Sequence, residues 1–309
     1  VTAYSYAQSI DTTPIVVESS FKTLTYEEAV EKTVKDFSNY DSIVSKWEGQ
    51  LEYIKESSDN EDKYGYGTYK PGTLDSVRTA IEKSKETAQN CGLQSELDSE
   101  AKRLNSEITQ LLSDNSMPFV RTYKNSLDAN DWSVFASGET QLSVENNEFL
   151  FRSMSGLQYV LDMRPLTPRE TVRCQVNFGD MNGWEAFAIR KTPDSISPNG
   201  GMILGGQGGG GYYIVVKQDY IELQRCPQIV GQIRVSVAND NKIIAPNTWV
   251  EIECSCETID GESHVIFKVD GKTIIDYTSK EDAVEGSGYF GFMNNPGANS
   301  GIRMRPCED

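Results

Sequence analysis

Two neighbouring segments carry aromatic, charged and amide side chains at a spacing that suits the surface of a β-sheet. The first is 184–190, where the side chains of an extended strand point alternately to opposite faces. One face then has a ring and a cation on either side of two small residues: Trp184, Ala186, Ala188 and Arg190. This pattern predicts a shallow floor with polar walls.

The second segment, residues 212–225, predicts a β-hairpin with Gln218-Asp219 as its two-residue turn. In that register Lys217 pairs with Tyr220, Val215 with Glu222 and Tyr213 with Gln224. The inward side chains are apolar: Ile214, Val216, Ile221 and Leu223. The outward face then carries the residues Tyr213, Lys217, Tyr220, Glu222 and Gln224.

Such a face suits a sugar, because aromatic rings stack on C–H patches while amides and charges bind hydroxyls. Asn294 and Asn295, in an expected turn, add further amides. The glycine-rich run at 200–211 predicts a loop beside the hairpin, since no Lys-Ser/Thr pair and no helix follows it as a phosphate loop requires. The alternative is that these residues are the ordinary solvent face of an antiparallel sheet.

Metal and thiol chemistry have weaker signals. Acidic turns at 180–182 and 270–271 could offer oxygen ligands to calcium, but no EF-hand pattern is present, so no cofactor is expected. Zinc is disfavoured, because the chain has a CxC pair and a single histidine, His264. Among the six cysteines, Cys254 and Cys256 share one face of a strand and are poorly placed to bond to each other. Buried thiols are therefore at least as well supported as disulfides.

The candidate face indicates binding rather than catalysis. Glycoside hydrolysis usually needs two carboxylates across the sugar, and only Glu222 falls on this face. No serine nucleophile elbow is found, and the neighbours of His264 are typical of an ordinary strand. A glycan-active enzyme and a protein-binding adhesion module remain the alternatives.

Composition limits the partners. The chain has 309 residues, with 46 acidic against 29 basic side chains and a formal charge of −17, which repels nucleic acids and anionic lipid surfaces. No apolar run reaches the length of a membrane span. The chain begins Val1-Thr2-Ala3 without a methionine, from which we expect that a leader has been removed.

The elements that must position these residues change character along the chain. Residues 1–24 are expected to be a tether. A capping box at Thr25 and Glu28 begins a helical part, 25–115, in which 26–54, 74–88 and 97–111 carry single apolar stripes. Such helices must bury their stripes against each other, which predicts an antiparallel bundle. Residues 116–309 instead contain regularly spaced strands between turn residues and predict a β-sandwich or jelly roll. The fold class is therefore α+β, with two domains.

Two stretches of the second half resemble a known family. They are 212–225 with Asn247-Thr248-Trp249, and Val269-Asp270-Gly271-Lys272 continuing to 286–292. Both resemble hairpins and strands of bacterial concanavalin-like and laminin-G-like domains, over roughly 130–306. The helical part, with Tyr69-Lys70-Pro71-Gly72, resembles FIVAR-type modules. The combination implies an exported or cell-surface bacterial protein that binds polysaccharide, with the helices as a spacer.

Overall fold

The computed structural model describes residues 2–3, 15–16, 35–57, 65–124, 127–135, 139–155, 158–183, 185–191, 210–226, 232–294 and 301–307. These residues form two compact units. One consists of the described residues up to Leu51 together with Asp75–Ile108, and the other of Glu52–Leu74 and Thr109–Asp309. The capping box at Thr25 and Glu28 lies outside the described residues.

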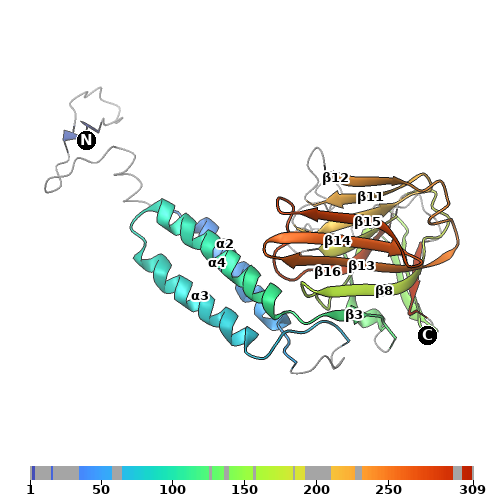
Figure 1. The fold of residues 1–309 in the computed structure, drawn as a ribbon, viewed down its shortest axis with the longest axis horizontal. Coiled ribbons are helices and arrows are strands. Elements are labelled where there is room, and N and C mark those ends of the chain that lie inside the picture. Colours follow the sequence, from blue (N-terminus) through green and yellow to red (C-terminus); the bar gives the residue numbers. More distant parts are fainter. Residues whose placement is uncertain are drawn as a thin grey trace. The chain divides into compact units, whose positions relative to one another are not determined.

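The described helices are α2 (Ser38–Gln50), α3 (Thr73–Asn90) and α4 (Gln94–Asn115), followed along the chain by strands (Figure 1). In the first unit, Tyr40 of α2 donates a hydrogen bond to Ser84 of α3, and Trp47 of α2 donates to Asn105 of α4. Two short strands, β1 (Thr2–Ala3) and β2 (Ile15–Val16), pair antiparallel. None of the described helices is both long enough and apolar enough to cross a membrane.

The apolar stripe predicted on α4 is buried at Leu97, Ala101, Leu104 and Ile108. The stripe continues through Leu112, whereas the predicted Leu111 is only half-buried. Four-residue steps from Leu104 keep the side chains on one face, so Leu112 follows Ile108.

The second unit is an antiparallel β-sandwich of two sheets. The seven-stranded sheet has the order β12-β11-β10-β9-β16-β7-β4. Its strands are β4 (Trp132–Phe135), β7 (Gln158–Asp162), β9 (Glu185–Lys191), β10 (Tyr212–Val216), β11 (Tyr220–Arg225), β12 (Ile233–Ala238) and β16 (Tyr289–Asn294).

The eight-stranded sheet has the order β15-β14-β13-β8-β17-β6-β5, and β3 (Phe119–Arg121) pairs parallel with β8. The other strands are β5 (Thr140–Glu145), β6 (Glu148–Ser153), β8 (Glu170–Asn177), β13 (Trp249–Ile259), β14 (Glu262–Val269), β15 (Lys272–Ser279) and β17 (Ile302–Arg305). Between the sheets lies the main core, where Phe187 contacts the rings of Phe178, Phe267 and Phe292.

The hairpin register predicted from the sequence is confirmed. Tyr213 pairs with Gln224, Val215 pairs with Glu222, and the Lys217 amide donates to the Tyr220 carbonyl across the turn. The four apolar side chains expected to point inward belong to the main core. The strand β12 was not predicted, although Ile233–Ala238 alternates in the required way.

The segment between α2 and α3 contributes to the sandwich unit. Tyr69 is fully buried there, and its hydroxyl lies 3.0 Å from that of Ser287. The Tyr69 backbone forms hydrogen bonds with Lys55 and Ser57. Burial raises the pKa of Tyr69 to about 12. We call residues 52–57 and 65–74 the connector.

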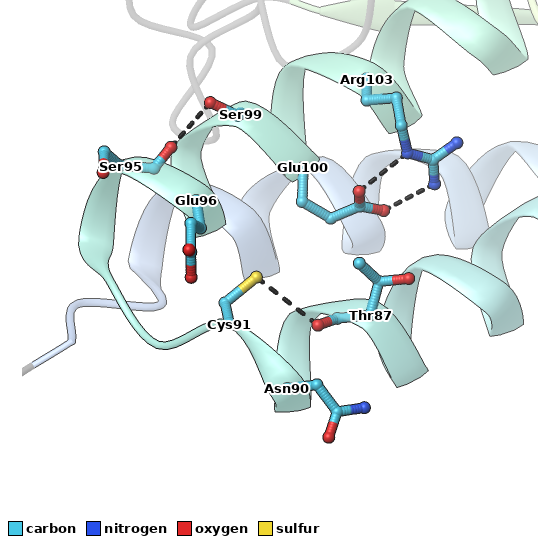
Figure 2. Close-up of a pocket in the computed structure, with 8 residues that line it drawn as sticks. All are labelled: Thr87, Asn90, Cys91, Ser95, Glu96, Ser99, Glu100 and Arg103. Atoms are coloured by element: carbon cyan, nitrogen blue, oxygen red, sulfur yellow. Dashed lines mark hydrogen bonds and ion pairs between the residues drawn. The ribbon is translucent and has the colours of Figure 1, made fainter.

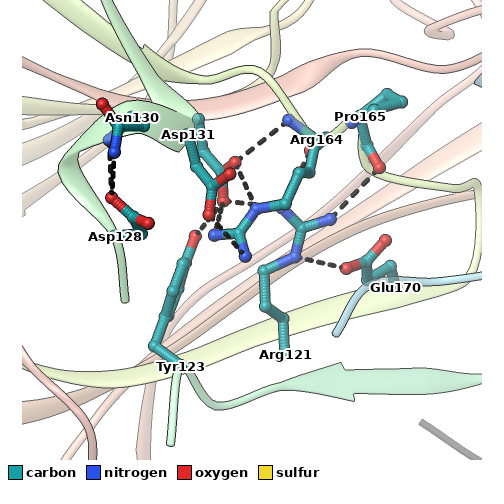
Figure 3. Close-up of polar contacts among 9 residues, drawn as sticks. Arg121, Tyr123, Asp128, Asn130, Asp131, Arg164, Pro165 and Glu170 are labelled. Carbon is teal, nitrogen blue, oxygen red and sulfur yellow. Dashed lines mark hydrogen bonds and ion pairs between the residues drawn. The ribbon is translucent and has the colours of Figure 1, made fainter. Parts of the chain in front are cut away.

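A buried ionic network lies beside the connector (Figure 3). Arg121 donates to Asp162 at 2.9 Å and to Glu170 at 2.6 Å, with all three side chains inaccessible to solvent. Glu170 also accepts hydrogen bonds from the backbone amides of Thr167 and Gly67. A Cβ at Gly67 would come within 2.6 Å of the Glu170 carboxylate, so a side chain there would force the residues of the network to shift.

Candidate functional site

The outer faces of the two sheets differ in their chemistry. On the eight-stranded sheet, cations pair with carboxylates of adjacent strands: Arg173 with Glu251, Arg169 with Glu257, and Lys268 with Glu253. His264 Nε2 likewise lies 2.7 Å from Asp276 Oδ1. Cross-strand pairs of this kind are typical of a solvated sheet surface.

The outer face of the seven-stranded sheet instead carries a second apolar cluster. Its buried members are Tyr159, Leu161, Ala186, Ala188, Tyr213, Val215, Cys226, Tyr289 and Met293. Strands β7, β9, β10 and β16 are consequently buried on both faces. Two predictions are therefore wrong, that of an open floor at Ala186 and Ala188 and that of an exposed Tyr213, because these side chains are buried.

Described side chains account for part of this closure. The rings of Tyr159 and Tyr213 stack at 6.2 Å and their hydroxyls hydrogen-bond. The ammonium of the buried Lys191 lies 4.7 Å from the centre of the Tyr213 ring and contacts the thiol of Cys226. From the connector, Tyr53 packs edge-to-face on Tyr289 at 6.2 Å.

One flank of this face is partly accessible, where β11 meets β12 and the hairpin turns, because Lys217 and Tyr220 are half-buried and Ser236 is exposed. We define the flank as Lys217, Tyr220, Glu222, Gln224 and Ser236. The Lys217 ammonium lies 4.9 Å from the centre of the half-buried Tyr220 ring. Gln224 Nε2 donates to Glu222 Oε2 at 2.9 Å, and Ser236 Oγ lies 3.4 Å from Glu222 Oε1. Four predicted site residues thus meet on one face.

Ser236 was missed at the sequence level because its strand was missed. It lies directly opposite Glu222 in the β11–β12 pairing. The alternation of Ile233, Val235 and Val237 with polar or small residues was the available signal. Glu222 and Gln224 face the predicted side, but only 9% and 8% of their surfaces are exposed.

Arg190 does not join this face, which corrects the prediction. The β9–β16 pairing shifts so that Lys191 lies opposite Tyr289 while Ala188 lies opposite Gly291. One extra residue in β9 therefore forms a bulge, and Arg190 adopts a positive φ of 52°. The bulge turns Arg190 into the interior and gives its place on the outer face to Lys191.

Inside the sandwich, the Arg190 guanidinium bonds to neutral oxygens. Nη1 donates to the Cys256 carbonyl at 2.7 Å and to Thr258 Oγ1 at 3.1 Å, and Nη2 donates to the carbonyls of Val284 and Gly286. Burial lowers the pKa of Arg190. Its role is to join the two sheets.

Asn294 is also unsuited to bind an external ligand. It is the last residue of β16 and is fully buried, not part of a turn. Its Nδ2 donates to Glu185 Oε2 at 2.6 Å, and its Oδ1 accepts from the Ser153 amide at 2.7 Å. Burial raises the pKa of Glu185 well above its usual range. Trp184 and Asn295 lie outside the described residues.

The glycine-rich run is described only at its end. Gly211 has a φ of +99°, and a Cβ there would lie 2.6 Å from the Arg190 carbonyl oxygen. Glycine is therefore required at this position because its backbone lies too close to the bulge at Arg190 for a Cβ. Residues 200–209 lie outside the described part.

Metal ligands do not gather in the described ranges, where no three His, Cys, Asp or Glu side chains could hold an ion together. In the acidic turn at 180–182, Asp180 Oδ1 accepts from the Asn182 amide. All six cysteines are free thiols, and five of them are buried. The interpretation of the strand cysteines as buried thiols is confirmed.

Hollows also lie elsewhere among the described residues. One of about 850 Å³ lies between α3 and α4 and is lined by Cys91, Glu96, Glu100 and Arg103 among others (Figure 2). Its charges bond locally: Arg103 to Glu100 at 2.6 Å, and Glu96 to the amides of Gly92 and Leu93. Another of about 460 Å³ lies at the β13–β14 turn beside His264 and Glu257. His264 already contacts Asp276, and Glu257 already contacts Arg169. Neither arrangement indicates a ligand.

Comparisons with known proteins gave only distant matches. No family model and no curated protein sequence matches the chain. Among solved structures, the metal-free carbohydrate recognition domain of Emp46p is similar with 10% identity and a TM-score of 0.43, over 60% of this chain and 92% of that one.

A galectin-like protein of unknown function from Bacillus subtilis has 11% identity and a TM-score of 0.43, over 60% of this chain and 90% of the other. A lectin from Bauhinia forficata, in complex with GalNAc, has 11% identity and a TM-score of 0.37, over 59% and 92%.

Proposed function

We propose that the protein is an exported, non-catalytic carbohydrate-binding protein whose ligand binds at the flank. The observation that carries this proposal is the meeting, on one partly accessible edge, of a half-buried tyrosine ring, an ammonium, and a largely buried carboxylate fixed by an amide and a hydroxyl. A sugar needs this combination, because its C–H patches pack on a ring while its hydroxyls both donate and accept.

The flank is better suited than the opposite sheet face. There the charged groups are satisfied by each other, as in the Arg173–Glu251 and Arg169–Glu257 pairs. Among the described strands of the seven-stranded sheet, Glu222 is the one residue that carries a carboxylate on the outer face. We therefore expect binding without hydrolysis, which needs a second carboxylate.

The helical part is proposed to be a spacer. The sequence resemblance to FIVAR-type and concanavalin-like modules supports this role and supports export to the cell surface. Fractionation of the source cells tests export, which requires the protein outside the cytoplasm.

The binding proposal is tested on a glycan array followed by calorimetry on each positive sugar. Tyr220→Ala removes the ring, and Glu222→Gln removes the fixed charge while keeping the shape. We expect each to weaken binding by about tenfold, the cost of one lost stacking contact or charge-assisted hydrogen bond. Glu145→Gln, an exposed site on β5, is the matched control and should bind like wild type.

Wild-type affinity in both flank variants would reject the flank. No binding across a broad array would reject the carbohydrate proposal. Sugar turnover that Glu222→Gln abolishes would show an enzyme.

A further inference from the structure

We infer that the sugar bound at the flank carries a negatively charged group, and that Lys217 recognises it. This inference rests on the proposed function and specifies its ligand as an acidic sugar, with a carboxylate or sulfate on the ring that packs against Tyr220. The Lys217 ammonium lies over the Tyr220 ring, which is the ring proposed to stack on the sugar.

Among the described residues, Lys217 contacts an aromatic ring and not a carboxylate. In the described part of the chain it has no carboxylate partner, and the group it contacts is the Tyr220 ring at 4.9 Å. In the other sheet, Arg173, Arg169 and Lys268 contact carboxylates, whereas Arg305 lies over the Trp249 ring and donates to Gln175. In the described residues, Lys217 therefore has an aromatic contact and no carboxylate contact, in a chain with 46 acidic and 29 basic residues.

Glu222, the carboxylate of β11 on this face, is engaged by other groups. Glu222 Oε2 accepts from Gln224 at 2.9 Å, and Oε1 faces Ser236 at 3.4 Å. The flank therefore presents two different groups along β11. At the turn, the Lys217 cation lies over the Tyr220 ring, and two residues further on, Glu222 is a hydrogen-bond acceptor.

The backbone holds Lys217 in this position. Its amide donates to the Tyr220 carbonyl at 2.9 Å, and its carbonyl accepts from Asn239 Nδ2 at 2.7 Å. The methylene stem of the lysine can lie along the ring while the ammonium stays in solvent. An anionic group on a sugar that packs at Tyr220 would then meet a cation already in place.

Net charge limits the ligand further. A formal charge of −17 repels a densely charged polymer at long range, whereas contacts within the Debye length of about 8 Å are governed by local groups. The ligand is therefore a sugar with isolated acidic residues, not a highly sulfated chain.

The test compares two probes by calorimetry at physiological salt: a disaccharide ending in glucuronate and the same disaccharide ending in glucose. We expect wild type to bind the acidic probe about tenfold more tightly, as a charge-assisted hydrogen bond gives. Lys217→Ala should lower the affinity for the acidic probe about tenfold more than the affinity for the neutral probe, and Lys217→Arg should retain the preference. Lys272→Ala, exposed on β15, is the matched control.

The outcomes separate the two proposals. Equal affinity for both probes, unchanged in Lys217→Ala, would overturn the acidic ligand while leaving sugar binding intact. A preference that Lys217→Ala preserves would overturn the role of Lys217. Binding of neither probe would overturn both proposals for these sugars.

Discussion

Arg190 Nη1 in one sheet of the sandwich donates a 2.7 Å hydrogen bond to the carbonyl oxygen of Cys256 in the other. The same guanidinium bonds to Thr258, Val284 and Gly286. It reaches them because the bulge at Arg190 points its side chain inward. A single buried cation thereby joins β9 to β13 and to the segment that precedes β16.

Removal of this side chain should destabilise the sandwich. Arg190→Met keeps the apolar stem but leaves buried carbonyl oxygens without donors, at about 1–3 kcal/mol for each unsatisfied group. We expect a loss of roughly 3 kcal/mol in the free energy of unfolding, measured by urea titration. Arg173→Met, at an exposed pair on β8, should change it by less than about 1 kcal/mol. Equal effects of the two variants would show that Arg190 does not join the sheets.

Glu185 should make stability depend on pH. Its folded-state pKa is raised by burial, so its contribution is fully present below the unfolded pKa, near 4.3, and is lost as pH rises toward the folded value. Glu185→Gln has no such loss, so its stability relative to wild type should increase by up to about 1.4 kcal/mol per pH unit in that window.

Chemical denaturation at a series of pH values from 4 upward measures this difference. Glu145→Gln, which changes an exposed carboxylate of the same unit, serves as the control. A constant difference between Glu185→Gln and wild type across the series would mean that Glu185 is ionised normally in the folded protein.

Gly67 should tolerate no side chain. A Cβ there would lie 2.5 Å from Thr167 Oγ1 and 2.6 Å from Glu170 Oε2, beside the Arg121 network. We expect Gly67→Ala to destabilise the sandwich by about 1–3 kcal/mol, as overpacking does. Gly49→Ala in α2 meets nothing within 4 Å and should stabilise its helix slightly.

Thermal unfolding monitored by circular dichroism distinguishes the two glycine variants. If Gly67→Ala unfolds like wild type, the connector is not held against the buried network.

Thiol reactivity should follow burial. Of the six free cysteines, Cys91 at the end of α3 is the half-exposed one, while the other five are buried in the sandwich. Burial raises the pKa of the Cys174 thiol well above its usual value and that of Cys307 to about 11, which keeps both protonated and unreactive. A chromogenic disulfide reagent should label one thiol quickly in native protein and six in denaturant. Fast labelling that persists in Cys91→Ser would contradict this assignment.

The sequence predicted the parts of the fold that depend on local patterns. Alternation around the Gln218-Asp219 turn was enough to place Lys217 beside Tyr220 and Glu222 beside Gln224 on one face. The alternation could not reveal the bulge at Arg190. One extra residue in a strand reverses the face to which the following side chains point, and the sequence pattern does not show where this happens.

Long-range burial was also hidden from sequence reasoning. Tyr213 was expected to be exposed, although Tyr212–Val216 is apolar on both faces, a feature of strands buried on both sides. Tyr69 lies among turn residues, and only tertiary packing reveals that it inserts into the sandwich.

The central claim is that sugar binds at the flank, and chemical-shift mapping of isotope-labelled protein tests it most directly. On titration with a sugar that binds the intact protein, the amides of Lys217, Tyr220, Glu222 and Ser236 should shift in proportion to occupancy. The amides of Glu253 and Lys268, on the outer face of the opposite sheet, should not shift. Shifts centred on Glu253 and Lys268, or on α3 and α4, with an unchanged flank would contradict the account.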